Sequence, residues 1–213
     1  MRSLFPWLVL GTVLIGAAGC SRSEPEETKV TEEGVDIQKN PLGALSALVG
    51  AGKDIEKYQE EIANMPAVDP VHFSELIKAL PDVPSGWTAA DARGESSEMG
   101  DFKMSRANRT YTKDGGEERV EVSIEDWAYH QALYLPFMMA ARFSQETTEG
   151  YNKGIKIGED PGREEYQTAS KSGNRSVLAK KRYHIKIDVD NAPASMFDEW
   201  WPLVKVGDLP TAN

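Results

Sequence analysis

Cysteine is nearly missing from this sequence, since Cys20 is the only one among 213 residues. A single cysteine has no partner within its own chain, so an intrachain disulfide is excluded. Long apolar stretches are also scarce, and the run at residues 4–18 is shorter than the roughly 20 residues that a transmembrane helix needs. The sequence therefore indicates neither a disulfide framework nor a membrane-spanning helix at this run.

Basic residues are outnumbered, with 24 lysines and arginines against 34 aspartates and glutamates. Because Arg2 precedes them, residues 20–213 carry 23 basic and 34 acidic side chains, a net charge of −11. Nucleic-acid binding needs positive charge to displace counterions from phosphates, so this balance argues against a nucleic-acid partner. It argues equally against electrostatic adhesion to anionic lipids, which attract basic segments.

Motifs of the common enzyme and cofactor classes are absent. There is no Gly-x-Ser-x-Gly nucleophile elbow, no phosphate-binding loop and no dinucleotide fingerprint. The three histidines, His72, His130 and His184, lack the spacing and the accompanying cysteines of a zinc site. We therefore expect no metal, no cofactor and no catalytic residue. One alternative stays open, an enzyme with a carboxylate–histidine site near Asp126 and His130.

The chain does have an export signal at its beginning. Arg2 gives a short positive region, residues 4–18 are apolar, and residues 17–19 are small and stand directly before Cys20. This order is typical of a secretory signal peptide with a small-residue cleavage site. We expect residues 1–19 to be that signal peptide.

Small residues followed directly by cysteine resemble the lipobox of bacterial lipoproteins. The resemblance implies diacylglycerol transfer to the sulfur of Cys20, cleavage before Cys20 and acylation of the new amino group. Several acyl chains anchor a protein stably, because each buried methylene contributes about 0.8 kcal/mol. In the sorting rule of enterobacterial lipoproteins, aspartate after the cysteine retains the protein in the inner membrane. Ser21 stands there instead, which implies an outer-membrane lipoprotein facing the periplasm, with the membrane as a partner through its acyl chains.

The mature chain divides into a tether and one domain. Residues 20–39 are polar, acid-rich and poor in large apolar groups, so they cannot bury enough surface to offset the entropy of ordering. We expect the lipidated cysteine to be followed by a disordered acidic tether over this segment. Residues 40–213 are long enough for one domain with a real core. Its helical part is expected at 41–80 and its sheet-bearing part at 86–205.

Hydrophobic periodicity predicts where the helices and strands lie. Apolar residues at three- and four-residue steps predict a helix over 41–64, and Asp69 is expected to cap a second helix that Pro81 ends. Alternation at 105–112 and 120–125, on either side of an Asp-Gly-Gly turn, predicts a β-hairpin. The remaining predicted elements are a helix over 131–143, strands at 154–158, 163–169, 177–179 and 183–189, and a short helix over 194–204.

Four other features favour a structural interpretation over a functional one. The acidic residues Glu95, Glu98 and Asp101 are expected in a solvated loop, and His184 is expected on the solvent face of the last strand. The Met-rich helix over 131–143 is expected to pack on the core. Trp200 and its neighbour are consecutive in a helix, so their rings point in different directions and one belongs to the core.

Antiparallel strands with inserted helices predict an α+β fold. We expect an antiparallel sheet with helices packed on one face, preceded by a flexible tether and an N-terminal helix.

Several segments resemble a group of uncharacterised bacterial envelope proteins. They are residues 80–87, 105–111, 120–126, 150–153, 165–166 and 181–183. The order of strands and helices is also distantly similar to the PsbP-like fold, which implies a fold but no chemistry. We expect a non-enzymatic, membrane-anchored envelope lipoprotein that binds a protein partner or a small ligand in the periplasm. The alternative is a periplasmic enzyme with its site near Asp126 and His130.

Overall fold

A computed structural model describes residues 35–36, 60, 64, 68–100, 102–128 and 130–211. The expected signal peptide, Cys20 and nearly all of the helix expected over 41–64 lie outside these residues. Of the expected tether, only Val35–Asp36 is described, as the short strand β1. Within the described ranges, no helix has both the length and the apolar composition needed to cross a membrane.

Strands dominate the described part of the chain. They are β1 (Val35–Asp36), β2 (Trp87–Ala89), β3 (Arg93–Met99), β4 (Phe102–Lys113), β5 (Arg119–Asp126), β6 (Phe143–Thr147), β7 (Gly150–Ile157), β8 (Asp160–Gln167), β9 (Ser172–Ala179) and β10 (Tyr183–Asp190). The helices are α2 (Phe73–Ala79), α3 (Gln131–Ala140) and α4 (Met196–Trp200), followed by the 3₁₀ turns η1 (Trp201–Leu203) and η2 (Val206–Asp208).

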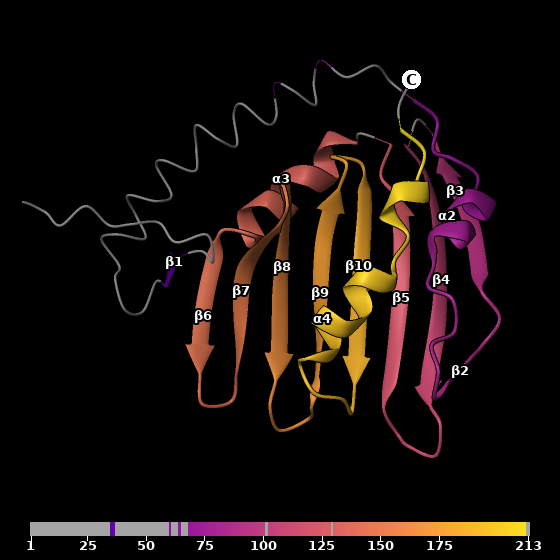
Figure 1. The fold of residues 1–213 in the computed structure, drawn as a ribbon. Coiled ribbons are helices and arrows are strands. Elements are labelled where there is room, and N and C mark those ends of the chain that lie inside the picture. Colours follow the sequence, from indigo (N-terminus) through magenta and orange to yellow (C-terminus); the bar gives the residue numbers. More distant parts are fainter. Residues whose placement is uncertain are drawn as a thin grey trace, which may run out of the picture.

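All strands join one sheet in the order β1-β6-β7-β8-β9-β10-β5-β4-β2, with β3 also pairing β4 (Figure 1). Every neighbouring pair is antiparallel except β1 and β6. After β5 the chain crosses through α3 to the far end of the sheet, and β6 to β10 return as a meander until β10 pairs with β5. Strand β5 therefore pairs on one edge with β4, which precedes it in the sequence, and on the other edge with β10, which is distant in the sequence.

The hairpin predicted around Asp-Gly-Gly is confirmed. Thr112 on β4 stands opposite Arg119 on β5, and the turn between them contains Gly115 at φ 69°. A positive φ is strained for most side chains but not for glycine. The turn residues therefore fix the pairing of β4 with β5 locally.

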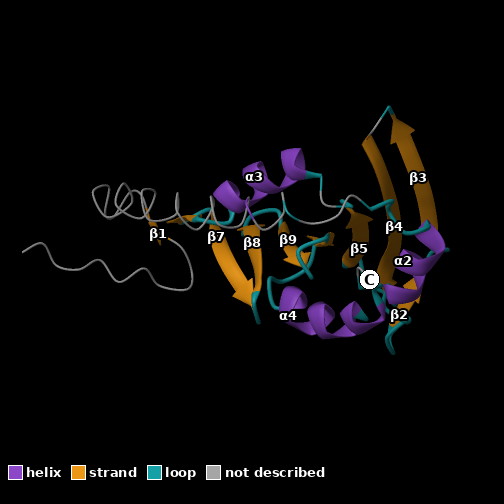
Figure 2. Ribbon diagram, turned by 90° about the horizontal axis from the view of Figure 1, so that it is seen from above, coloured by secondary structure: helices purple, strands orange, loops and turns teal. Residues whose placement is uncertain are grey.

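The larger core lies on the face of the sheet covered by α2 and α4 (Figure 2). The alternating residues of the central strands supply most of it: Ala107, Tyr111, Val120, Val122, Ile124, Ala179, Tyr183, Ile185, Ile187 and Val189. From α4, Trp200 inserts its ring between Trp87 and Tyr111, with ring centroids 5.0 and 4.6 Å away. Each large apolar side chain buried here contributes about 1.5–3 kcal/mol.

A smaller core lies under α3 on the opposite face (Figure 2). It contains Trp127, Tyr134, Phe137, Met138 and Leu178. At the end of this helix the carbonyl of Ala141 approaches Gly154 of β7 so closely that a β-carbon there would overlap it. The missing side chain thus lets α3 seat directly on the sheet.

The prediction of an α+β fold with helices on one face is wrong. The described chain is mostly one large antiparallel sheet, and its three α-helices have only 7, 10 and 5 residues. These helices lie on both faces, with α3 on one and α2 and α4 on the other (Figure 2). The strand content was underestimated at β3, where all seven residues from Arg93 to Met99 are exposed and no apolar alternation arises.

The predicted cap of the second helix is also wrong. Helix α2 begins after His72, whose Nδ1 accepts a hydrogen bond from the backbone N–H of Ser74 at 3.3 Å. Asp69 instead accepts a hydrogen bond from Lys103 Nζ at 2.9 Å. The cap therefore lies three residues further along the chain than predicted.

Candidate functional site

Helix α3 leaves half of its own face of the sheet uncovered. Its cluster reaches Leu178 near the end of β9, whereas the residues from Ser172 to Asn174 at the start of that strand lie beyond the helix. The uncovered half is hollowed into a trough of about 980 Å³. We call it the polar trough, after the side chains that line it.

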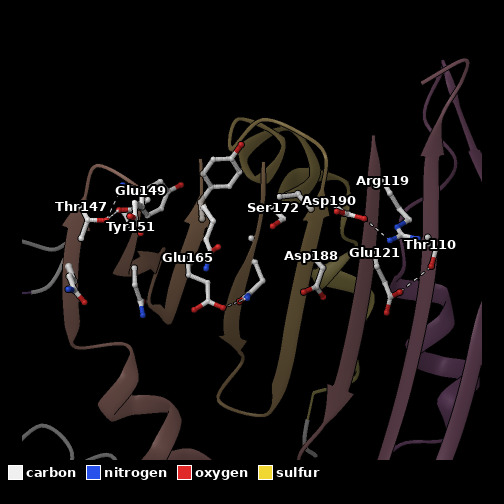
Figure 3. Close-up of a pocket in the computed structure, with 18 residues that line it drawn as sticks. Thr110, Arg119, Glu121, Thr147, Glu149, Tyr151, Glu165, Ser172, Asp188 and Asp190 are labelled. Carbon is white, nitrogen blue, oxygen red and sulfur yellow. Dashed lines mark hydrogen bonds and ion pairs between the residues drawn. The ribbon is translucent and has the colours of Figure 1, made fainter. Parts of the chain in front are cut away.

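One row of directly opposed residues forms the middle of the polar trough. It runs across seven neighbouring strands, from β6 to β4, and consists of Gln145, Asn152, Glu165, Asn174, Asp188, Glu121 and Thr110. Figure 3 shows Glu165, Asp188, Glu121 and Thr110 following one another along this row. Neighbouring strands lie about 4.8 Å apart, so the row is roughly 29 Å long.

A second row lies nearer to the strand ends. Its members are Thr147, Gly150, Gln167, Ser172, Asp190 and Arg119. Both rows consist of amide, carboxylate, hydroxyl and guanidinium groups apart from the glycine. The two rows therefore offer hydrogen bonds over the whole length of the trough, and Tyr151, Tyr166 and Val189 complete the lining with apolar surface.

The charges of the polar trough are largely paired within the protein. Arg119 Nη2 lies 2.6 Å from Asp190 Oδ2, and Lys186 Nζ lies 2.6 Å from Asp188 Oδ1. Glu165 accepts hydrogen bonds from Arg163, whose Nη2 is 2.6 Å away, and from an asparagine on β9.

Glu121 and Glu149 are the two carboxylates that give the polar trough its excess of negative charge. Glu121 stands directly opposite Asp188 across the β5–β10 pair, and it accepts only amide and hydroxyl hydrogen bonds, from Asn108 and Thr110. Like charges placed opposite each other are unfavourable in a sheet. With Glu149 at the rim, Glu121 leaves the lining with an excess of negative charge that repels anions.

Asn152 has unused hydrogen-bonding capacity at the floor of the polar trough. Its Oδ1 is shielded from solvent, yet it accepts no hydrogen bond from any described residue. Buried acceptors are nearly always paired in native proteins.

The described residues contain no group of three His, Cys, Asp or Glu side chains placed to hold a metal ion. At the alternative site near Asp126 and His130, each of the two side chains is hydrogen-bonded to other groups. Asp126 is fully buried, and its two oxygens accept hydrogen bonds from Arg182 at 2.8 and 2.7 Å and from two backbone N–H groups. His130 Nε2 instead contacts the backbone of Lys103, 2.9 Å from its oxygen. The two side chains thus bind different partners.

The prediction that His184 lies on a solvent face is wrong. Its side chain is only 15% exposed, because α3 covers this end of β10. Nδ1 lies 3.1 Å from Glu125 Oε2, and the ring stacks on Trp127 with centroids 4.7 Å apart. The hydrogen bond from His184 is the main cause that lowers the pKa of Glu125. Packed between aromatic rings, the imidazole links β10 to β5.

A second buried ionic cluster lies on the opposite face, beneath α4. Glu164 accepts hydrogen bonds from Arg175 Nε and from the Tyr151 hydroxyl, both at 2.6 Å. Burial and this hydrogen bond raise the pKa of Tyr151. Arg175 also donates to the carbonyl of Phe197 and to Asp198. The cluster therefore fastens α4 to the sheet.

The remaining described residues that the sequence singled out lie in strand β3 and at the end of helix α4. Glu95 and Glu98 belong to the exposed edge strand β3, so the expected loop there is wrong, while Asp101 lies outside the described residues. Trp200 is buried and Trp201 is half-buried, as expected from their adjacency.

The residues of the polar trough were not predicted as a site. Their one signal in the sequence is the polar half of each alternating strand, such as Lys186, Asp188 and Asp190 on β10. That signal indicates a solvent face but not which strands are neighbours. The site becomes visible only once the register aligns the strands.

Comparison with known proteins found no relative of this chain. No protein-family model, no curated protein and no solved structure matches the chain.

Proposed function

We propose that this chain is a lipid-anchored protein of the bacterial cell envelope that binds a hydrophilic ligand in its polar trough without transforming it. The observation that carries the proposal is the unbroken row of polar side chains from seven strands, on the half of a sheet face that α3 leaves uncovered. Concave surfaces with convergent polar groups are the usual places for ligands.

The anchor rests on the N-terminal sequence. Small residues before Cys20, after an apolar run that is too short to span a membrane, support export followed by lipidation. The acidic composition of the following segment supports a domain held near the membrane by its acyl chains and not by its charge.

Hydrogen–deuterium exchange tests the binding site on the full chain purified in detergent. A water-soluble, low-molecular-weight extract of the bacterial envelope is added, and exchange is followed in peptides from β5 and β8 to β10. We expect slower exchange in the strands that line the trough. Ser172→Trp fills the trough with an indole ring and should abolish the effect, whereas Ser96→Trp on the exposed edge strand β3 should keep it. Equal protection in both variants would remove the trough from the proposal.

Lipidation is tested separately with Cys20→Ala. We expect labelled palmitate to be incorporated into the wild-type chain and not into the variant, and we expect only the wild type to sediment with membranes. Cys20→Ser serves as a second variant with a smaller change in polarity. Label in either variant would show that the anchor is not at this residue.

A further inference from the structure

The chemistry of the polar trough restricts its ligand to one class. Both rows of the lining are polar, so an acyl chain finds little to pack against, although Tyr151, Tyr166 and Val189 also contribute to the lining. Its carboxylates outnumber its basic groups, so a phosphate or an acidic polymer is repelled. Neutral polar ligands and cations remain.

Cations are disfavoured at three of the carboxylates, which already have basic partners. Asp190, Asp188 and Glu165 each hold an arginine or lysine nitrogen at 2.6 Å. A cationic ligand would have to compete with these nitrogens. A neutral ligand with hydroxyl groups can instead add to the existing pairs, because each hydroxyl both donates and accepts.

The hydrogen-bonding groups also have a pattern that suits a chain of sugar rings. Three amides that donate and accept, three carboxylates that only accept and one hydroxyl follow one another along the row, at intervals of about 4.8 Å from strand to strand. The carboxylates Asp188 and Glu121 lie side by side towards the β4 end of the row, where each can accept from one of two neighbouring hydroxyls. The length of roughly 29 Å and the volume of about 980 Å³ exceed what a single sugar ring fills.

We infer that the polar trough binds a linear, neutral oligosaccharide that lies across the strands from β6 to β4. The inference rests on the proposed function, since it names the ligand class of the same site. Glu121 and Asp188 would accept hydrogen bonds from a ring near the β4 end, and the amides of Asn174 and Asn152 would bind the rings that follow towards β6.

Three hexamers of different charge test the inference by isothermal titration calorimetry on the full chain. They are the neutral hexamer of N-acetylglucosamine, its fully deacetylated cationic form and the anionic hexamer of galacturonic acid. We expect heat of binding from the neutral hexamer alone, with an affinity that hardly changes with salt, because screening acts on charged ligands. Tighter binding of the cationic or the anionic hexamer would overturn the assignment.

Single substitutions locate the contacts. Asp188→Asn and Glu121→Gln each remove a charged acceptor and should weaken the neutral hexamer roughly ten- to hundredfold. Glu98→Gln, on the exposed strand β3, is the matched control and should leave the affinity unchanged. Equal affinities in all three variants would contradict the inference.

Failure of the ligand class and failure of the proposed function give different results. If no hexamer binds while the envelope extract still slows exchange in β8 to β10, the trough binds another hydrophilic ligand and only the sugar assignment is refuted. If neither the hexamers nor the extract has an effect, both are refuted.

Discussion

The buried pair of Asp126 and Arg182 joins two strands of the sheet to the segment before α2. Asp126 is fully buried, Arg182 is 4% exposed, and the two side chains share two hydrogen bonds of 2.8 and 2.7 Å. The carboxylate also accepts from the backbone N–H groups of Val71 and Ala128. The pair thus ties the ends of β5 and β10 to the segment before α2.

Replacing Asp126 with alanine leaves the Arg182 charge buried without its carboxylate. Removal of one partner of such a pair destabilises a protein by about 3–5 kcal/mol. Typical domains have a free energy of unfolding of about 5–15 kcal/mol, so this one change removes a large part of the stability. We expect urea unfolding of the Asp126→Ala full chain to show that loss as a lower midpoint.

A double variant separates lost charge pairing from lost packing. In Asp126→Leu with Arg182→Met both charges are gone, and we expect it to recover about 2 kcal/mol relative to Asp126→Ala. The matched control is Glu75→Gln at the exposed pair with Lys78, where the expected loss is about 1 kcal/mol or less. If Asp126→Ala loses no more than this control, the buried pair does not hold the two strands as argued here.

Three further predictions follow from packing and from titration. Trp200→Ala should lower the free energy of unfolding by about 3–5 kcal/mol because its ring is buried, and Trp201→Ala by only about 1 kcal/mol; comparable losses in urea unfolding would contradict the placement of the two rings. Gly154→Ala should destabilise by about 1–3 kcal/mol because the new methyl overlaps the end of α3, whereas Gly207→Ala, in open space, should change stability by about 0.5 kcal/mol at most; equal thermal midpoints would refute this seating. The pKa of Glu125 is lowered by its histidine partner. The carboxylate therefore contributes to the free energy of unfolding above its unfolded pKa of about 4.3, and this contribution is lost as the pH falls through the lower folded value. The free energy of unfolding measured across that window should depend less on pH in Glu125→Gln, and an unchanged slope would count against the hydrogen bond.

The parts of the fold predicted from the sequence are those with one buried face. Val120, Val122 and Ile124 alternate with polar residues because one side of β5 packs on the core. Gly115 marks the adjoining turn, where a positive φ is required. Burial and turn chemistry both act locally, so both leave a readable pattern.

The parts that were missed have no such face. Strand β3 is exposed at every residue, and in β6 the three residues from Gln145 to Thr147 are exposed. Such strands are specified by backbone pairing with a neighbour, which side-chain periodicity does not record. The fold class was misjudged for this reason, because hidden strands made the chain look richer in helix than it is.

The candidate site was unpredictable for a related reason. Glu121 and Asp188 were visible as polar positions on alternating strands, but their meeting depends on the pairing of β5 with β10. Residues joined across this pair lie up to 71 positions apart in the sequence. No local signal specifies a register over that distance.

The crossover through α3 also determines the order in which the protein can fold. Strand β5 pairs early with β4 across a short turn, but its other edge stays open until β10, the last strand, has been made. Folding is slow when contacts are distant in sequence, and an open apolar edge invites pairing with other chains. Until β10 pairs with it, the Val- and Ile-rich strand β5 has a free edge that is exposed to neighbouring copies of the chain. We therefore expect refolding yields to fall steeply as protein concentration rises.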